Sequence, residues 1–292
     1  MAYNLLILKK IFDYIKEKKF ENIKTALDFG DQDLNMSFED LIENFKKNKV
    51  IYKEKKFEAL KEFPKRPRVP SSTLWLTLGF IEADRVDITK ISRRQENIAD
   101  GTVYEMDLNY KLNKENMSKK YQLVTDFGNN EHVFNLGEAF KTTHEVCEKN
   151  GLIWTIQNLY GANGYYNFDL SYFESMAASN QYLIEDSFMI IKKFNTMKLM
   201  PIDDNVFKNN DLNNLDEIQV SYLFRKQNDD SFKFPYQGLG DTPIRDKFYK
   251  LINNTEVKYD LKRFYIPRKV DQINTKVLLN EIIKRIKKKF LK

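Results

Sequence analysis

The sequence predicts a doubly wound α/β fold, in which a mostly parallel sheet carries helices on both faces. Strand-like segments alternate with helical ones along most of the chain, and the last two, 182–194 and 217–226, predict an antiparallel edge. Two strands, at 25–30 and 121–128, end in Asp-Phe-Gly before a helix. Such a glycine turn presents backbone N–H groups and a carboxylate where open α/β sheets bind ligands. The chain is therefore expected to be a cofactor-binding enzyme.

The N-terminal half shows the alternation clearly. Apolar residues at helical spacing predict a helix over 4–19. Ser37 as N-cap and Asp40 in the first turn predict a second helix over 37–49. The other elements expected here are a strand at 25–30, a proline-rich loop at 61–72, a short helix at 72–80 closed by Gly79, and a strand at 81–88.

The second half continues the pattern and brings the expected number of strands to seven. A helix over 135–149 is expected to end at Gly151, a natural residue for a helix C-terminus. The remaining elements expected are strands at 103–109, 121–128 and 152–157, a loop at 158–169, a helix at 170–180, and the two β-rich segments at 182–194 and 217–226.

Composition indicates a soluble globular protein. The chain has 292 residues, of which 42% are hydrophobic, so it can bury a core. No run of 18 apolar residues is present, and the amphipathic start lacks the features of a signal peptide, so a cytoplasmic location is expected. Cys147 is the only cysteine, which excludes an internal disulfide and a multi-cysteine metal site; no metal is expected.

The positive charge is confined to the end of the chain. Residues 275–292 hold seven Lys or Arg and one Glu, which accounts for the whole net charge of +6. The neutral remainder argues against a nucleic-acid partner. An apolar stripe predicts a basic amphipathic helix in this tail, formed by Leu278, Ile282, Ile286 and Phe290. Such a helix lies on an anionic membrane or packs on the domain or a second subunit, and these alternatives stay open.

Several segments, taken in order, resemble one enzyme family. They are the strand with Asp28 and Gly30, a second strand ending in Asp87, the MDLN turn at 106–109, and the runs LVTDFGNNEHVFN, NGLIWTIQNLYGANGYYNFDLSYFESMAASN and SYLFRKQNDDSFKFPYQ. The set resembles class I S-adenosylmethionine-dependent methyltransferases, in particular a bacterial branch associated with sugar and surface-polysaccharide modification. The resemblance implies a Rossmann-like methyltransferase domain with seven strands over 1–240, and a helical extension with the basic tail over 241–292.

The resemblance also implies that S-adenosylmethionine binds at the carboxyl edge of the sheet. Asp28 and Gly30 are implied to hold its amino-acid end, and Asp107 or Asn109 its adenine amino group. Asp87 is implied to accept from the ribose diol, a role for which Asp84 and Glu82 compete. The full set implied for the cofactor is Asp28, Gly30, Gln32, Asp87, Asp107, Leu108, Asn109 and Asp126.

Methyl transfer to a hydroxyl needs a base that removes the proton as the new bond forms, and histidine has a suitable pKa. His132 directly follows the fourth strand, beside Glu131. The expected catalytic residues are therefore His132, Glu131 and Asp126, although both carboxylates alternatively cap the next helix or bind water. His144 lies in the middle of a predicted helix, so packing is the favoured interpretation there.

The implied methyl acceptor is a sugar, a nucleotide sugar or a glycan intermediate. Tyr165 and Tyr166 lie in an aromatic loop after the fifth strand, where they stack on a sugar ring or form a lid. Asn163 and Arg93 complete the substrate-binding candidates, with Arg93 suited to a phosphate or an acidic sugar. A homo-oligomer is a further expectation.

Two departures from the family pattern support another hypothesis. Gly30 is followed by Asp31, Gln32 and Asp33 where the family's loop continues G-x-G, and Asn163 stands where the branch has histidine. The alternative is therefore a non-catalytic scaffold or partner subunit with the methyltransferase fold. A nucleic-acid methyltransferase is disfavoured, because TDFGNNEH stands where a Pro-Pro-aromatic motif would be expected.

Overall fold

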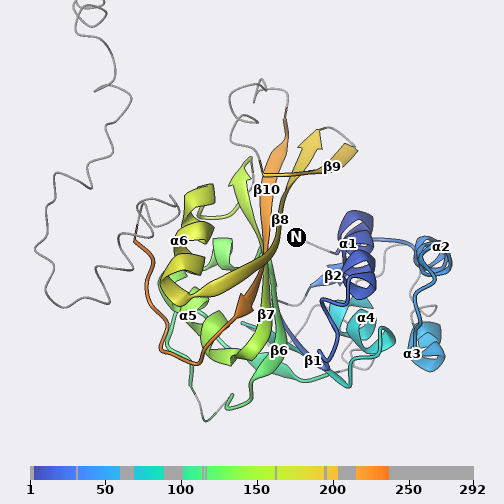
Figure 1. The fold of residues 1–292 in the computed structure, drawn as a ribbon, viewed down its shortest axis with the longest axis horizontal. Helices are drawn as coiled ribbons and strands as arrows, with labels where there is room; N and C mark the ends of the chain where they lie inside the picture. The colour runs from blue at the N-terminus through green and yellow to red at the C-terminus, as the bar shows by residue number, and fades with distance from the viewer. Residues whose placement is uncertain are drawn as a thin grey trace, which may run out of the picture. The chain divides into compact units, whose positions relative to one another are not determined.

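A computed structural model describes residues 3–30, 32–59, 69–88, 101–113, 115, 117–161, 163–193, 196–202 and 215–236. Its centre is an eight-stranded sheet with the strand order β5–β4–β1–β6–β7–β10–β8–β9 (Figure 1). The strands are β1 (Thr25–Phe29), β4 (Glu82–Asp87), β5 (Val103–Glu105), β6 (Tyr121–Phe127), β7 (Cys147–Tyr160), β8 (Tyr182–Lys193), β9 (Thr196–Met200) and β10 (Glu217–Lys226). A separate two-stranded ladder pairs β2 (Asp33–Leu34) with β3 (Val69–Pro70).

Strand directions confirm the mostly parallel sheet. The pairs β5–β4, β4–β1, β1–β6 and β6–β7 are parallel. Strand β10 runs antiparallel to both β7 and β8, so β8 points the same way as β7, and β9 is antiparallel to β8. All seven expected strands are present, and β9 adds an eighth. The antiparallel strand expected at the edge is β10, which lies inside the sheet, while β9 occupies the edge.

The helices cover both faces of the sheet, which confirms the doubly wound arrangement. They are α1 (Leu5–Lys16), α2 (Phe38–Asn48), α3 (Glu54–Ala59), α4 (Ser71–Thr77), α5 (Leu136–Val146) and α6 (Leu170–Asn180). The first four lie on one face and α5 and α6 on the other (Figure 1). None of the helices in the described ranges is long and apolar enough to cross a membrane.

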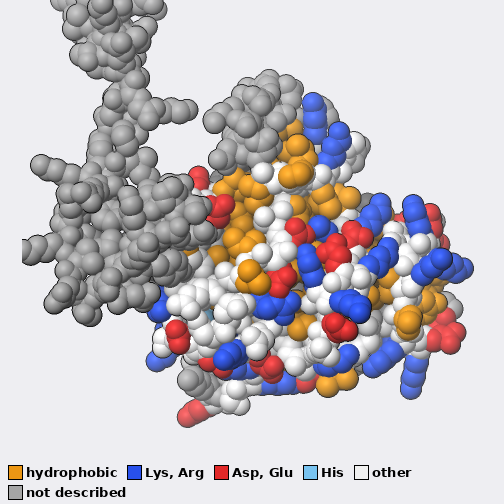
Figure 2. Space-filling model, viewed as in Figure 1, with side chains coloured by type: hydrophobic (Ala, Val, Ile, Leu, Met, Phe, Trp, Pro, Cys, Tyr) orange, Lys and Arg blue, Asp and Glu red, His pale blue; other side chains and the backbone are white. Residues whose placement is uncertain are grey.

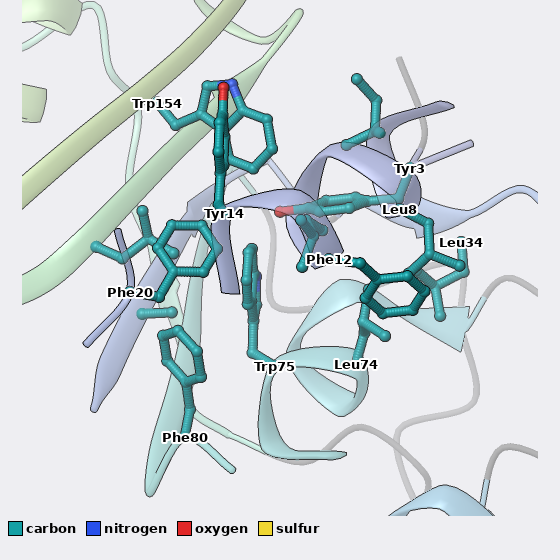
Figure 3. Close-up of a cluster of buried hydrophobic side chains, with 14 of the residues drawn as sticks. Tyr3, Leu8, Phe12, Tyr14, Phe20, Leu34, Leu74, Trp75, Phe80 and Trp154 are labelled. Carbon is teal, nitrogen blue, oxygen red and sulfur yellow. The ribbon is translucent and has the colours of Figure 1, made fainter. Parts of the chain in front are cut away.

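The core on the α1–α4 face is rich in aromatic side chains (Figure 3). Trp75 from α4 packs edge-on against Phe20 at a centroid distance of 5.9 Å, and Tyr14 from α1 packs edge-on against Trp154 from β7 at 5.1 Å. Aromatic rings favour this geometry because the positive ring edge meets the negative ring face. These contacts join the N-terminal helix to the middle of the sheet.

Local signals placed most helix starts correctly. Ser37 forms the expected N-cap of α2, where its Oγ accepts from the Asp40 backbone N–H and the Asp40 carboxylate accepts from the Ser37 backbone N–H. This reciprocal arrangement satisfies two N–H groups that the first turn leaves without helical partners. Of the apolar residues expected on the buried side of the first helix, Leu8, Ile11 and Phe12 are buried, and Leu5 and Ile15 are partly buried.

The expectation for the end of α5 was wrong. The helix stops at Val146 rather than at 149, because Cys147 already pairs with Tyr121 as the start of β7. The buried ammonium group of Lys226 donates to the carbonyl oxygens of His144 and Cys147. It thereby pairs carbonyl groups at the C-terminus of α5, where a positive charge also interacts favourably with the negative end of the helix dipole. Gly151 is instead required by close packing, since a Cβ there would lie 2.9 Å from Cys147 Sγ.

Other boundaries differ from expectation by a few residues. The strand expected over 103–109 ends at Glu105, and the residues after it form a turn. Strand β7 continues to Tyr160, three residues beyond its expected end at 157. The expected helical extension and its basic tail lie outside the described residues.

Candidate functional site

The carboxyl ends of four parallel strands lie side by side at one edge of the sheet. Phe29 of β1 is in register with Val86 of β4 and with Asp126 of β6, and Asp126 is in register with Thr155 of β7. The residues that follow these positions therefore share one edge. They include most of the candidates expected from the sequence.

A tight turn follows β1 at Gly30. This residue has a φ of +74°, and its N–H donates to Val86 O at 2.8 Å. A Cβ at this position would lie 2.8 Å from Asn129 Oδ1 and 3.2 Å from Gln32 Nε2, so only glycine fits. Gln32 Oε1 and Asn129 Nδ2 are both buried and have no hydrogen-bond partner among the described residues. The turn thus holds one unpaired acceptor and one unpaired donor.

Asp28 points into the core instead of toward the edge. Its side chain has no exposed surface, and it accepts hydrogen bonds from Tyr3, Ser71, Trp75 and Thr125. Burial raises the pKa of this carboxyl, and the four donors oppose that change. The side chain therefore ties the N-terminal segment and α4 to β1. Its expected contact with a cofactor stays a prediction.

The candidates for the adenosine end lie along β4 and the turn after β5. Asp87 ends β4 half-buried, and its carbonyl accepts from Met106 N at 2.8 Å. The Asp107 carboxylate accepts from the backbone and side-chain N–H groups of Asn109, at 2.9 and 2.8 Å. Leu108, which lies between Asp107 and Asn109 in the sequence, is buried. This turn holds Asp107 and Asn109 together, and their expected contact with adenine stays a prediction.

Asn109 also connects this turn to the start of α5. Its Oδ1 accepts from the backbone N–H of Asn135 at 2.8 Å, and its carbonyl accepts from Asn135 Nδ2 at 2.9 Å. Asn135 in turn caps α5 through the Glu138 backbone N–H. The two competitors for the ribose role are both engaged in the fold: Asp84 accepts from Thr102 N and Tyr121 OH, and Glu82 forms an ion pair with Lys119.

Asp126 shapes the turn after β6. It has no exposed surface, and its Oδ1 accepts from the backbone N–H groups of Asn129 and Asn130, both at 3.1 Å. Its Oδ2 accepts from Gln157 Nε2 at 2.6 Å. Burial raises the pKa of Asp126 to about 6, although these donors favour the charged form. Its expected catalytic and cofactor roles stay predictions. Its hydrogen bonds stabilise the turn that leads into residues 130–132, whereas α5, the helix expected next, is capped by Asn135.

Glu131 and His132 form an acid–base pair just beyond this turn. Glu131 Oε1 lies 3.6 Å from His132 Nε2, and Glu131 Oε2 accepts from the Asn158 backbone N–H at 2.8 Å. Burial raises the pKa of Glu131 to about 7, because the residue is only 3% exposed. The His132 side chain is 45% exposed, and partial burial lowers its pKa. A neutral His132 at pH 7 is able to accept a proton.

A polar cleft of about 410 Å³ opens beside this pair. Its walls come from η2 (Asn130–His132), the loop after β7, the carboxyl end of β8 and the start of β10, and they include Glu131, His132, Asn158, Asn163, Lys192 and Glu217. None of its lining residues comes from β1, from β4 or from the turn after β5. The cleft therefore lies at β7, β10, β8 and β9 and not over the Gly30 turn.

The aromatic loop after β7 packs directly on Glu131. The Tyr165 backbone N–H donates to Glu131 O at 2.8 Å, and a Cβ on Gly164 would lie 3.0 Å from Glu131 Cγ. The Tyr165 ring is 72% exposed and meets the exposed Phe134 ring edge-on, with centroids 6.4 Å apart. Tyr166 OH donates to Phe134 O at 2.6 Å. This loop brings Asn163 and Tyr165 close to the acid–base pair, while Arg93 lies outside the described residues.

His144 is packed, as the sequence analysis favoured. Its Nε2 lies 2.8 Å from Asp230 O, which only accepts, so this nitrogen carries the proton and Nδ1 accepts from Tyr182 OH at 2.7 Å. Burial lowers the pKa of His144 to about 4. The residue therefore stays neutral in the fold and serves as a structural link.

Sequence reasoning missed the amide side chains of the site. Asn129, Gln157 and Asn158 stand at the carboxyl ends of β6 and β7, and Gln219 lies beside Asn158 on β10. One signal was available, since polar amides ending an otherwise apolar strand are unusual in a buried position. The pairing with β10 was not readable from the sequence.

Comparisons with known proteins show similarity at the level of structure only. No protein-family model matches the chain, and no curated protein is similar in sequence. TehB from Haemophilus influenzae is similar with a TM-score of 0.42 and 12% identity, over 73% of this chain and 61% of TehB, so the chain spans less than two thirds of that protein. N-methyltransferase NodS from Bradyrhizobium japonicum, solved with S-adenosyl-L-homocysteine, is similar with a TM-score of 0.41 and 8% identity, over 77% and 89% of the two chains.

Proposed function

We propose that this protein is an S-adenosylmethionine-dependent methyltransferase that methylates a hydroxyl group of a sugar, a nucleotide sugar or a glycan intermediate. One observation carries the proposal. The left-handed Gly30 turn, the carboxylate of Asp87, the Asp107–Asn109 turn and the Glu131–His132 pair all follow parallel strands at one edge of the sheet. That edge is where this class of sheet binds nucleotide cofactors.

The Gly30 turn offers complementary groups for the amino-acid end of the cofactor. An α-carboxylate accepts hydrogen bonds and an α-ammonium group donates them. The side chains of Asn129 and Gln32 lie beside Gly30. Their unpaired atoms, Asn129 Nδ2 and Gln32 Oε1, are a donor and an acceptor. These two amides are therefore suited to bind the amino-acid end of the cofactor, in place of the backbone groups of the family's G-x-G loop, of which this chain keeps only Gly30.

Asp87 and the turn after β5 are suited to the nucleoside. A carboxylate at the end of β4 is an acceptor for both hydroxyls of a ribose diol. The Asp107 carboxylate and the Asn109 side chain lie in the turn that follows the neighbouring strand, because Asp87 pairs with Glu105 at the end of β5. S-adenosylmethionine supplies an electrophilic methyl group when bound, and the chain's own residues hold both reactants and remove the proton.

His132 is suited to remove the proton from the acceptor hydroxyl. It faces the cleft, has a lowered pKa and is therefore neutral at pH 7. Glu131 lies 3.6 Å away, and its ionised carboxylate stabilises the imidazolium that forms on His132. Backbone contacts from Asn158 and Tyr165 hold Glu131 in place.

The cleft supports a polyhydroxyl acceptor. Amide and carboxylate side chains dominate its walls, and such groups both donate to and accept from hydroxyls. The exposed rings of Tyr165 and Phe134 each follow a lining residue, Asn163 or His132, by two positions in the chain, and they offer apolar faces on which a pyranose ring can stack. On the face shown in Figure 2, basic and acidic side chains are interspersed over the described surface, which supports the expectation that nucleic acid is not the partner.

Calorimetry with S-adenosylmethionine and S-adenosylhomocysteine tests the proposal directly. Saturable binding of both is expected, and Asp87→Asn should weaken it roughly tenfold or more through loss of charge-assisted hydrogen bonds. Glu82→Gln, at the amino end of the same strand, is the matched control and should bind like the wild type. A folded wild-type protein without measurable affinity would reject the proposal.

A non-catalytic scaffold is the second candidate, and one observation favours it. The Asn129 side chain occupies the space directly beside Gly30, and the Asp28 carboxylate is fully enclosed. A protein that binds the cofactor yet transfers no methyl group to any nucleotide sugar in a broad panel would support this candidate.

A further inference from the structure

Three polar side chains form a chain of hydrogen bonds in the wall of the cleft. Asn158 of β7 and Gln219 of β10 are directly opposite each other in the antiparallel register. Gln219 Nε2 donates to Asn158 Oδ1 at 3.3 Å and also to the Glu217 carboxylate. Glu217 lies two residues before Gln219 on the same strand, and all three residues line the cleft.

This chain of bonds determines which way each amide faces. The Glu217 carboxylate, 3.7 Å from Lys192 Nζ, accepts hydrogen bonds and has none to donate when ionised. Gln219 must therefore turn its NH₂ group toward Glu217, and the second hydrogen of that group reaches Asn158. Asn158 must then present its oxygen to Gln219, so its Nδ2 faces away from this partner.

The Asn158 Nδ2 group is left without a hydrogen-bond partner in the described part of the chain. The residue is 1% exposed, and its backbone N–H and C=O are used by Glu131 and Phe168. A buried N–H donor without an acceptor is costly, and most buried polar groups in native proteins are paired with another protein group or with ordered water. The rest of the residue is held rigidly, so the donor cannot turn away to find another partner.

We infer that Asn158 Nδ2 binds an oxygen atom of the molecule that occupies the cleft, and that Gln219 and Glu217 are positioning residues for it. The inference rests on the proposed function in that the same cleft receives the methyl acceptor. A hydroxyl oxygen suits the arrangement best, because it accepts from Asn158 and donates to His132 or Glu131 in the same cleft. Asn158 thereby favours acceptors that place an oxygen atom within hydrogen-bond distance of its Nδ2.

Nuclear magnetic resonance of the full chain tests this directly. The side-chain amide of Asn158, labelled with ¹⁵N, is followed while methyl glucopyranoside, methyl galactopyranoside and glucuronate are added. At least one of these probes should shift the Asn158 amide signal in a saturable way. No change at Asn158 with any of the three would overturn the inference.

Variants decide whether the contact is a hydrogen bond from Nδ2. Asn158→Asp replaces the donor by an acceptor of the same shape and should lower probe affinity about tenfold or more. Asn48→Asp makes the same chemical change on α2, outside the cleft, and keeps the oxygen that accepts from Lys16 Nζ, so its affinity should remain within about twofold of wild type. Equal affinities in Asn158→Asp and wild type would contradict the inference.

A second variant serves if Asn158→Asp does not fold. Gln219→Met keeps the side-chain length but cannot donate, so the Asn158 amide loses its anchor and probe affinity should fall several-fold. Unchanged affinity in Gln219→Met, with the probe shift still seen at Asn158, would overturn the positioning role. S-adenosylhomocysteine binding, measured on the same samples, reports on the proposed function separately because it does not require this cleft.

Discussion

Two buried carboxyl groups, those of Asp28 and Glu131, lie at the carboxyl ends of neighbouring strands of the same sheet, yet their surroundings differ. Asp28 near the end of β1 accepts from four side-chain donors and has no exposed surface. Glu131 after β6 accepts from one backbone N–H, lies near a half-exposed histidine and lines a cleft of about 410 Å³. The Asp28 carboxylate has its acceptor positions occupied by protein donors, whereas the Glu131 carboxylate can accept further hydrogen bonds from a molecule in the cleft. Position at the end of a strand therefore does not decide between structure and chemistry.

Removal of the Asp28 carboxylate should have the largest effect on stability. Asp28→Ala leaves the donors from Tyr3, Ser71, Trp75 and Thr125 without an acceptor in a closed core, which should cost about 3–5 kcal/mol in the free energy of unfolding. Urea denaturation measures it. Asp107→Ala, at a half-exposed turn, is the comparison and should cost far less. A loss below 1 kcal/mol for Asp28→Ala would remove the contrast between the two carboxyl groups.

His132→Ala should affect turnover instead of stability. Loss of a general base lowers the rate by about 10²–10⁴-fold, and a half-exposed side chain contributes little to folding. Rates with an accepted nucleotide sugar and thermal unfolding give the two readouts. Affinity for S-adenosylhomocysteine should not change. Full turnover in this variant would exclude His132 as the base.

The raised pKa of Glu131 predicts a pH dependence of stability. A carboxyl whose folded pKa is about 7 binds its proton more tightly in the folded than in the unfolded state, so its stabilising contribution is complete below about pH 4.5 and is lost as pH rises through 7. The free energy of unfolding should therefore fall by roughly 1–3 kcal/mol between these values. Asp126, with a pKa of about 6, adds in the same direction. Glu131→Gln should flatten the curve, and an unchanged slope would contradict the assignment.

Tyr165→Ala should have the smallest effect. The ring is 72% exposed, so folding should change by less than about 0.5 kcal/mol. Loss of a stacking face should raise KM for a sugar acceptor by about three- to tenfold while kcat stays close to wild type. Tyr52→Ala, which removes an exposed ring of the α2–α3 region, is the matched control. A fall in kcat alone would place Tyr165 in the chemistry rather than at the mouth of the cleft.

The sequence by itself determined the alternation of strands and helices, the Ser37 cap and the glycine turn at Gly30. These features depend on residues within one or two turns of each other, so local periodicity and backbone preference are sufficient to predict them. The same reasoning placed Glu131 and His132 at the carboxyl edge, because parallel strands end together.

Only the tertiary structure decided which buried polar groups have all their hydrogen-bond partners within the protein and which do not. Asp28 is enclosed by side chains as far as 97 residues away in the chain, and α5 ends where Lys226, 79 residues beyond Cys147, reaches its carbonyls. The amide chain from Glu217 to Asn158 exists because β10 lies between β7 and β8. Hydrogen-bond partners of buried groups come from distant segments, and the sequence near each group carries no record of them.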